Sequence, residues 1–93
     1  MGIFSDRQVA FIQDARIEIQ GSISLLGGKF RLLLRGEQVD EATCNVGSAV
    51  TLRGQLKLGD TEQPVEAEVT QGWLGTRFHL RVAGQEQRLQ RMG

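Results

Sequence analysis

Alternation of apolar and polar residues constrains the fold of this chain more than any other feature of its sequence. From Ala15 to Leu25 every odd-numbered position is apolar or glycine, whereas every even-numbered position is polar or charged. Neighbouring side chains of a β-strand point to opposite faces of the sheet, so a period of two is typical of strands with one buried face. The pattern recurs as far as Arg91 and predicts an all-β protein.

Short turns separate the alternating segments. The 93 residues include 12 glycines and one proline, which suits tight turns between strands that remain free to pair. A chain of this length holds one modest core, so we expect a single domain over residues 1–93 with an antiparallel meander over 15–91. A sheet of six or seven such strands has two edge strands, whose unpaired backbone groups must be protected from pairing with another chain. We therefore expect a small closed barrel first and a two-sheet sandwich second.

The N-terminal segment allows two interpretations. Ser5 and Gln8 have the spacing of a capping box, and Phe4 and Val9 fall where residues pack across a helix start. This spacing predicts a short helix over residues 6–14. The alternative extends the odd-numbered apolar set backwards through Phe11, but the resulting strand of about 17 residues far exceeds the usual length.

Predicted turns set the strand registers. A two-residue turn at Gly27-Gly28 places Leu25 opposite Phe30. A turn at 36–37 places Leu34 opposite Val39, and a loop over 59–64 places Leu58 opposite Val65. A four-residue loop over 72–75 pairs Val69 with Phe78, and also pairs Glu68 with His79 and Glu66 with Arg81 on the polar face. A last strand is expected over 86–92, with Leu80 near Leu89.

Charge and composition exclude several classes of protein. Lys plus Arg and Asp plus Glu both number 11, so no net field attracts the chain to nucleic acid or to an anionic membrane. No apolar run approaches the length of a membrane span, and the first residues do not resemble a signal peptide. Cys44 is the only cysteine and cannot form an internal disulfide. We expect a cytoplasmic protein without a membrane segment.

Chemistry-bearing residues are few. His79 is the only histidine, and neither it nor Cys44 lies in a catalytic, metal-binding or nucleotide-binding motif. We therefore predict no catalytic residues, no metal and no cofactor. The chain is expected to be a binding module and not an enzyme.

Four apolar residues are left over once the core pattern is assigned. Leu26 and Leu33 fall on the outer face, where the predicted helix or a partner would cover them. Trp73 and Leu74 lie between two glycines at a hairpin tip, where the indole either anchors a partner or plugs the end of the barrel. These residues predict contact with a protein partner or with a second copy of the chain.

A basic strand face supports a second hypothesis. Outward-facing Lys29, Arg31, Arg35 and Arg53 could follow a nucleic-acid backbone, as in oligonucleotide-binding barrels. Such surfaces also need aromatic side chains that stack on bases. Trp73 is the only aromatic residue that the core pattern leaves free, so nucleic acid is the second expectation.

Overall fold

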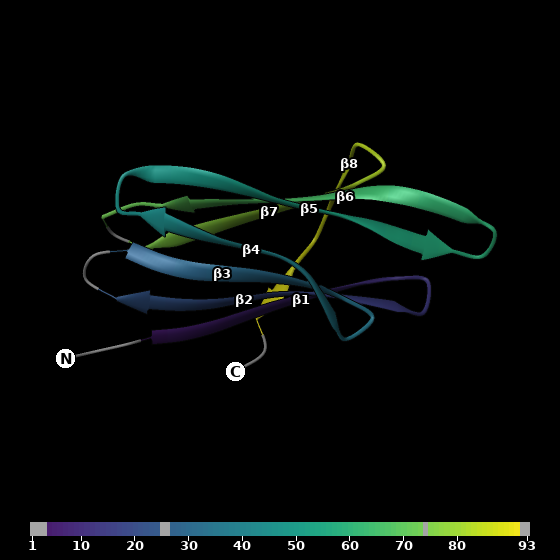
Figure 1. Ribbon diagram of the computed structural model, residues 1–93, viewed down its shortest axis with the longest axis horizontal. Helices are drawn as coiled ribbons and strands as arrows, with labels where there is room; N and C mark the ends of the chain where they lie inside the picture. Colours follow the sequence, from purple (N-terminus) through teal and green to yellow (C-terminus); the bar gives the residue numbers. More distant parts are fainter. Residues whose placement is uncertain (1–3, 25–26, 74, 92–93) are drawn as a thin grey trace.

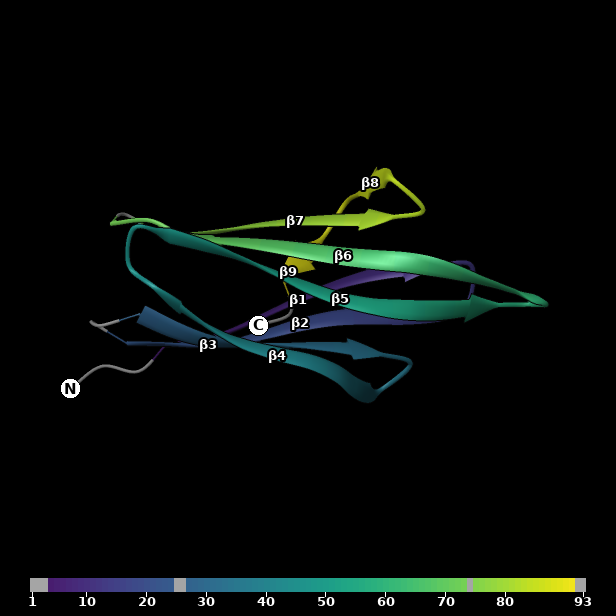
Figure 2. The same ribbon diagram turned by 45° about the horizontal axis from the view of Figure 1, so that its top comes forward.

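The protein is a sandwich of two antiparallel sheets (Figure 1, Figure 2). A computed structural model describes residues 4–24, 27–73 and 75–91, which contain strands and no helix. The strands are β1 (Phe4–Ile12), β2 (Ala15–Ser24), β3 (Gly27–Leu34), β4 (Glu37–Asn45), β5 (Ser48–Leu58), β6 (Thr61–Gln71), β7 (Thr76–Val82), β8 (Gln85–Gln87) and β9 (Gln90–Arg91). One sheet, sheet A, has the order β4-β3-β2-β1-β9, and the other, sheet B, has the order β5-β6-β7-β8.

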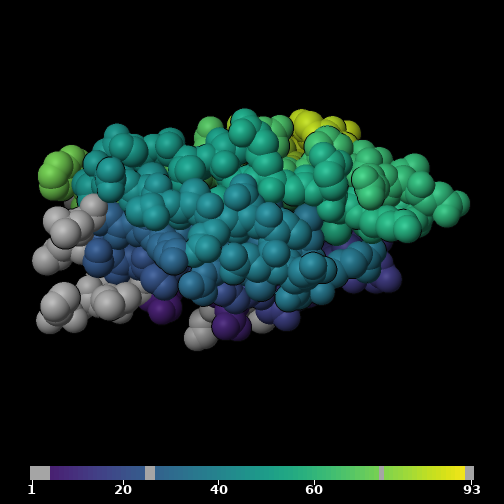
Figure 3. Space-filling model, in the orientation of Figure 1, coloured from purple at the N-terminus to yellow at the C-terminus, as the bar shows by residue number. Residues whose placement is uncertain are grey.

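The expected closed barrel is not confirmed, because no backbone ladder joins the two sheets among the described strands. Strands β4 and β5 follow one another in the chain but are edge strands of different sheets. Side-chain hydrogen bonds link the two sheets along this edge. The Asp40 carboxylate accepts a hydrogen bond from the Arg53 backbone N–H at 2.8 Å, and Arg35 donates to the Lys57 carbonyl at 2.9 Å. Figure 3 shows atoms of β4 and β5 lying against one another along this side.

The predicted helix over residues 6–14 is wrong, because this segment is a strand. β1 pairs with β2 along its whole length, from Phe4 opposite Ile23 to Ile12 opposite Ala15. The single long strand is wrong too, because a two-residue turn divides it and holds Gln13 at a φ of 56°. Pairing in the sheet buries both Val9 and Ala10, on opposite faces, and this burial outweighs a local capping signal.

The core lies between the facing sheets, on the side that the alternation predicts. Its largest fully buried side chains come from β2 to β7, namely Ile17, Ile19, Phe30, Leu32, Cys44, Leu52, Leu56, Val65, Val69 and Leu80. The rings of Phe30 and Phe78 meet edge to face across the sandwich, with their centroids 5.9 Å apart. The inward set of the sequence pattern is therefore confirmed as the core.

Two of the predicted registers are displaced by four residues. Phe30 pairs with Gly21 in place of Leu25, and Val65 pairs with Gly54 in place of Leu58. An even displacement keeps every side chain on its own face, so the error did not disturb the inward and outward sets. The predicted pairings between β6 and β7 are confirmed, including Glu68 opposite His79.

Gly21 and Gly28 explain the displaced register between β2 and β3. A Cβ atom on either glycine would lie 2.8 Å from ring atoms of Phe30. The phenyl ring therefore covers two positions that must lack side chains. Gly28 is required for this packing and not for a turn.

The turn before β4 also differs from the prediction. Leu34 pairs with Glu37, not with Val39, because Arg35 and Gly36 form the turn with φ values of 53° and 85°. A bulge follows at Val39, which leaves this residue 43% exposed.

The C-terminal segment does not form one strand over 86–92. It forms two short strands in different sheets: β8 pairs with β7, and β9 pairs with β1. Leu80 pairs with Gln87, while Leu89 packs against the core from the crossing segment. This crossing closes part of the side opposite β4 and β5.

Candidate functional site

Two turns lie at one end of the sandwich, which we call the loop end (left in Figures 1 and 2): one joins β4 to β5 and the other joins β6 to β7. The last residues of β2 and the first residues of β3 lie at the same end. In the connection between β6 and β7, the Gly72 N–H donates to the Gly75 carbonyl at 2.9 Å, and Trp73 lies in this turn. Trp73 is 89% exposed. The indole therefore does not plug the end of the core, as one of the two sequence interpretations required.

An apolar groove of about 440 Å³ lies beside Trp73. Ile23 contributes to its walls from the end of β2, Val46 contributes from the turn between β4 and β5, and Thr76 borders it at the start of β7. An ion pair between Asp6 and Arg91, at 3.2 Å, lies at the same groove. The loop end thus combines an exposed aromatic side chain with a depression that can accept an apolar one.

The edge of β7 next to this groove has no strand beside it in the described part of the chain. β8 pairs only with Leu80 to Val82. Successive residues of a strand direct their backbone N–H and C=O groups alternately toward one neighbouring strand and toward the other. The Ala83 N–H donates to the Pro64 carbonyl of β6, which fixes the residues that face β6. The odd-numbered residues of β7 therefore bond to β6, and the backbone groups of Thr76 and Phe78 point away from it.

The other predicted contact residues do not join Trp73. Leu33 is half-buried on the outer face of sheet A, near the end of β3 that lies away from the loop end. The helix that was expected to cover it is the strand β1. Leu26 and Leu74 lie outside the described residues.

The four predicted nucleic-acid contacts do not share one surface. Lys29 and Arg31 lie together on the outer face of sheet A, within 2.7 and 3.6 Å of Glu41. Arg35 lies in the turn before β4, 3.7 Å from Asp14, and Arg53 lies on β5 of the other sheet, 3.7 Å from Glu66. Each cation already has a carboxylate beside it, so these four residues do not form a continuous basic track.

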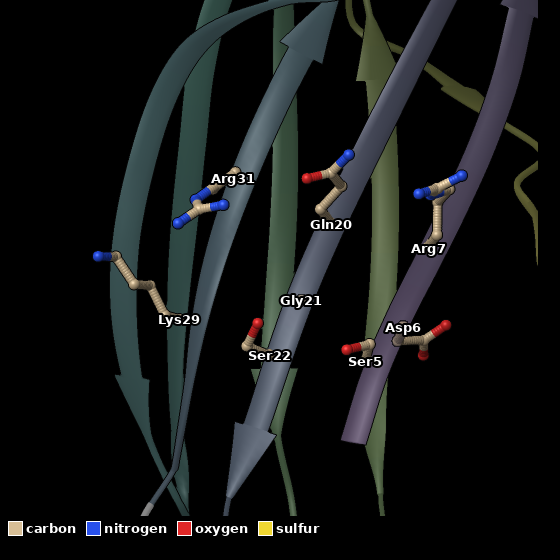
Figure 4. A pocket seen from close by; sticks show the side chains of 8 residues that line it. All are labelled: Ser5, Asp6, Arg7, Gln20, Gly21, Ser22, Lys29 and Arg31. Carbon is tan, nitrogen blue, oxygen red and sulfur yellow. The ribbon is translucent and has the colours of Figure 1, made fainter. Parts of the chain in front are cut away.

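A polar groove of about 420 Å³ lies on the outer face of sheet A (Figure 4). Arg7, Gln20 and Arg31 form one row across β1, β2 and β3, and Ser5, Ser22 and Lys29 form the next. Short serine side chains between long cationic ones leave the hollow. Arg7 was missed because its segment was assigned to a helix.

His79 and Cys44 are not placed to act together. Cys44 is buried in the core, with its thiol 3.2 Å from the Ser48 carbonyl oxygen. His79 lies on the outer face of sheet B, 3.2 Å from Glu86. Within the described ranges, no three potential metal ligands gather.

The strand order and the two facing sheets define this protein as a small antiparallel β-sandwich. No protein-family model matches the chain, and neither the curated proteins nor the solved structures include a significant match. Over residues 4–24, 27–73 and 75–91, no helix is long and apolar enough to cross a membrane.

Proposed function

We propose that the protein is a non-enzymatic binding module that holds an extended segment of a protein partner at the loop end. The observation that carries this proposal is the 89% exposure of Trp73 beside an apolar groove. Tryptophan is highly buried in most folded proteins, and it is enriched among the residues that dominate binding energy at interfaces. Its exposure at a hairpin tip is explained if the indole is covered in a complex.

The unpaired edge of β7 indicates what kind of segment would bind. Thr76 and Phe78 offer backbone donors and acceptors in the spacing of a strand, and an added strand from a partner would satisfy them. Alternate side chains of such a segment would point toward the groove, where Ile23 and Val46 favour an apolar residue. Exposed Arg77 lies next to Trp73 in a second depression, so we expect an acidic residue in the same segment.

Selection from a random peptide library displayed on phage tests this proposal. We expect the wild-type protein to enrich peptides that alternate apolar and polar residues and carry an acidic residue. Trp73→Ala should abolish their binding. Thr76→Pro should also abolish it, because proline removes an N–H that points away from β6. Thr76→Val is the matched control, because it keeps the backbone donor and should keep the binding.

Three results would contradict the proposal. One is a library that yields no enriched sequence. Another is a set of selected peptides that bind equally well to Trp73→Ala and Thr76→Pro. The third is a dimer, detected by sedimentation, that dissociates on Trp73→Ala, because a second copy of the chain would then be the occupant of the loop end. Circular dichroism and thermal unfolding of each variant verify that the sandwich is intact.

A further inference from the structure

The outer face of sheet A carries a second surface, independent of the loop end. Across β1 to β4 it holds four cationic side chains, Arg7, Arg16, Lys29 and Arg31, but only two carboxylates, Glu18 and Glu41. The protein as a whole has no net charge. Two positive charges therefore remain on this face, and three of the four cations line one groove.

The geometry of the ion pairs leaves donors available in the groove. Arg7 approaches Glu18 through Nε at 3.4 Å, and Arg31 approaches Glu41 through Nε at 3.6 Å. No hydrogen bond engages the Nη groups of these two arginines within the described ranges. Lys29 shares the Glu41 carboxylate with Arg31.

The carboxylate at the groove is turned away from it. Asp6 alternates with Ser5 and Arg7 along β1, so its side chain points to the opposite face of the sheet (Figure 4). Its two oxygens are occupied by Gln8 and Arg91, at 3.3 and 3.2 Å. The groove thus presents donors from Arg7, Lys29, Arg31, Ser5 and Ser22 around one hollow, while the Gln20 side-chain amide nitrogen donates to Glu18.

We propose that this groove binds the phosphate group of a small phosphorylated molecule. A phosphate dianion has several acceptor oxygens, and guanidinium, ammonium and hydroxyl groups are the donors that suit them. The residues lining the groove include no aromatic side chain, so nothing there can stack on a base. The ligand class is therefore a small phosphate and not a single-stranded oligonucleotide.

Nuclear magnetic resonance titration with inorganic phosphate and with glycerol 3-phosphate tests this proposal. At constant ionic strength, we expect saturable shifts of the backbone amides of Gln20, Ser22 and Lys29. Saturation by both ligands would identify a phosphate-ester site, and saturation by inorganic phosphate alone would identify a site for the free ion. Both results support the proposal.

Two substitutions of opposite effect sharpen the test. Arg31→Gln should weaken binding by about tenfold, the equivalent of one good charged contact. Glu41→Gln should strengthen binding by about threefold, because it removes the carboxylate that competes for Lys29 and Arg31. Arg53→Gln is the matched control. Its Nε also lies 3.7 Å from a glutamate, but on the other sheet, and it should leave binding unchanged.

Any of three results would overturn the proposal. In the first, chloride at the same ionic strength produces the same amide shifts. In the second, Arg31→Gln and Arg53→Gln weaken phosphate binding equally, which would reveal only a general charge effect. In the third, a ten-nucleotide oligothymidylate binds to this face saturably and phosphate does not displace it, which would make single-stranded nucleic acid the ligand.

Discussion

Replacement of Gly21 by alanine should have opposite effects on stability in two backgrounds. In the native protein, the added Cβ would lie 2.8 and 2.9 Å from two ring atoms of Phe30, which is fully buried. The ring cannot move freely because its other edge lies over Gly28 and because it meets Phe78 edge to face. Overpacking of this kind costs about 1–3 kcal/mol.

The cost should disappear once the ring is removed. With Phe30→Ala in place, the remaining atom near the added Cβ is the Asp6 carbonyl oxygen, at an ordinary 3.9 Å. Gly21→Ala should then stabilise the protein by about 0.5–1 kcal/mol, because alanine loses less conformational freedom on folding than glycine. The two substitutions should therefore be coupled by about 1.5–4 kcal/mol.

Urea or thermal unfolding of the four proteins measures this coupling. Phe30→Ala alone should cost about 3–5 kcal/mol, which is a large part of the roughly 5–14 kcal/mol expected for a domain of this size. Phe30→Val can replace it if the alanine variant unfolds. Each kcal/mol should move the melting temperature by about 4–8 °C. Equal effects of Gly21→Ala in both backgrounds would refute the packing of the ring over this glycine.

Two further predictions concern charged side chains. A hydrogen bond from Lys29, with help from the charges of Lys29 and Arg31, holds the pKa of Glu41 below its ordinary 4.5. A carboxyl group whose pKa is lower in the folded than in the unfolded state stabilises the fold above the unfolded pKa, and this stabilisation is lost as pH falls through the folded pKa. In acid titration, the stability difference between wild type and Glu41→Gln should therefore fade below about pH 4.5. A difference that persists there would contradict this linkage. Asp40→Ala should expose the Arg53 N–H at the β5 edge, cost about 1 kcal/mol and promote aggregation in light scattering. Asp40→Asn, which keeps an acceptor oxygen, should behave like wild type; aggregation of both variants alike would contradict the edge role.

The faces of the strands could be predicted from the sequence, but the registers could not. A period of two separates Ile17 and Ile19 from Glu18, and the structure buries both isoleucines in the core. A shift of four residues preserves the same separation, so alternation cannot distinguish Gly21 from Leu25 as the partner of Phe30. The register depends on the size of the Phe30 ring and on the glycines beneath it.

The first strand shows where a local signal fails. Ser5 and Gln8 resemble a helix start, but only the pairing of β1 with β2 and β9 places Val9 in a buried position. The error concealed Arg7, which belongs to the polar groove of sheet A. Neither the pairing of β1 with β2 and β9 nor the place of Arg7 in the groove could be inferred from residues 4–12 alone.

The loop end was predicted in part. Trp73 was identified because glycines flank it and the core pattern does not use it, and the structure exposes it. The free edge of β7 could not be foreseen, because it depends on how far β8 extends along it. After Gln87 the chain leaves β7, and Leu89 packs against the core.

Fluorescence of Trp73 tests most directly whether the loop end is an open binding site. The chain contains one tryptophan, so its emission reports on this residue alone. In the isolated protein at low concentration, we expect emission and acrylamide quenching close to those of a tryptophan free in water. A peptide selected on the wild-type protein should shift the emission to shorter wavelength and protect it from the quencher. Emission that is already shifted and protected in the isolated protein, at every concentration, would contradict an open site at Trp73.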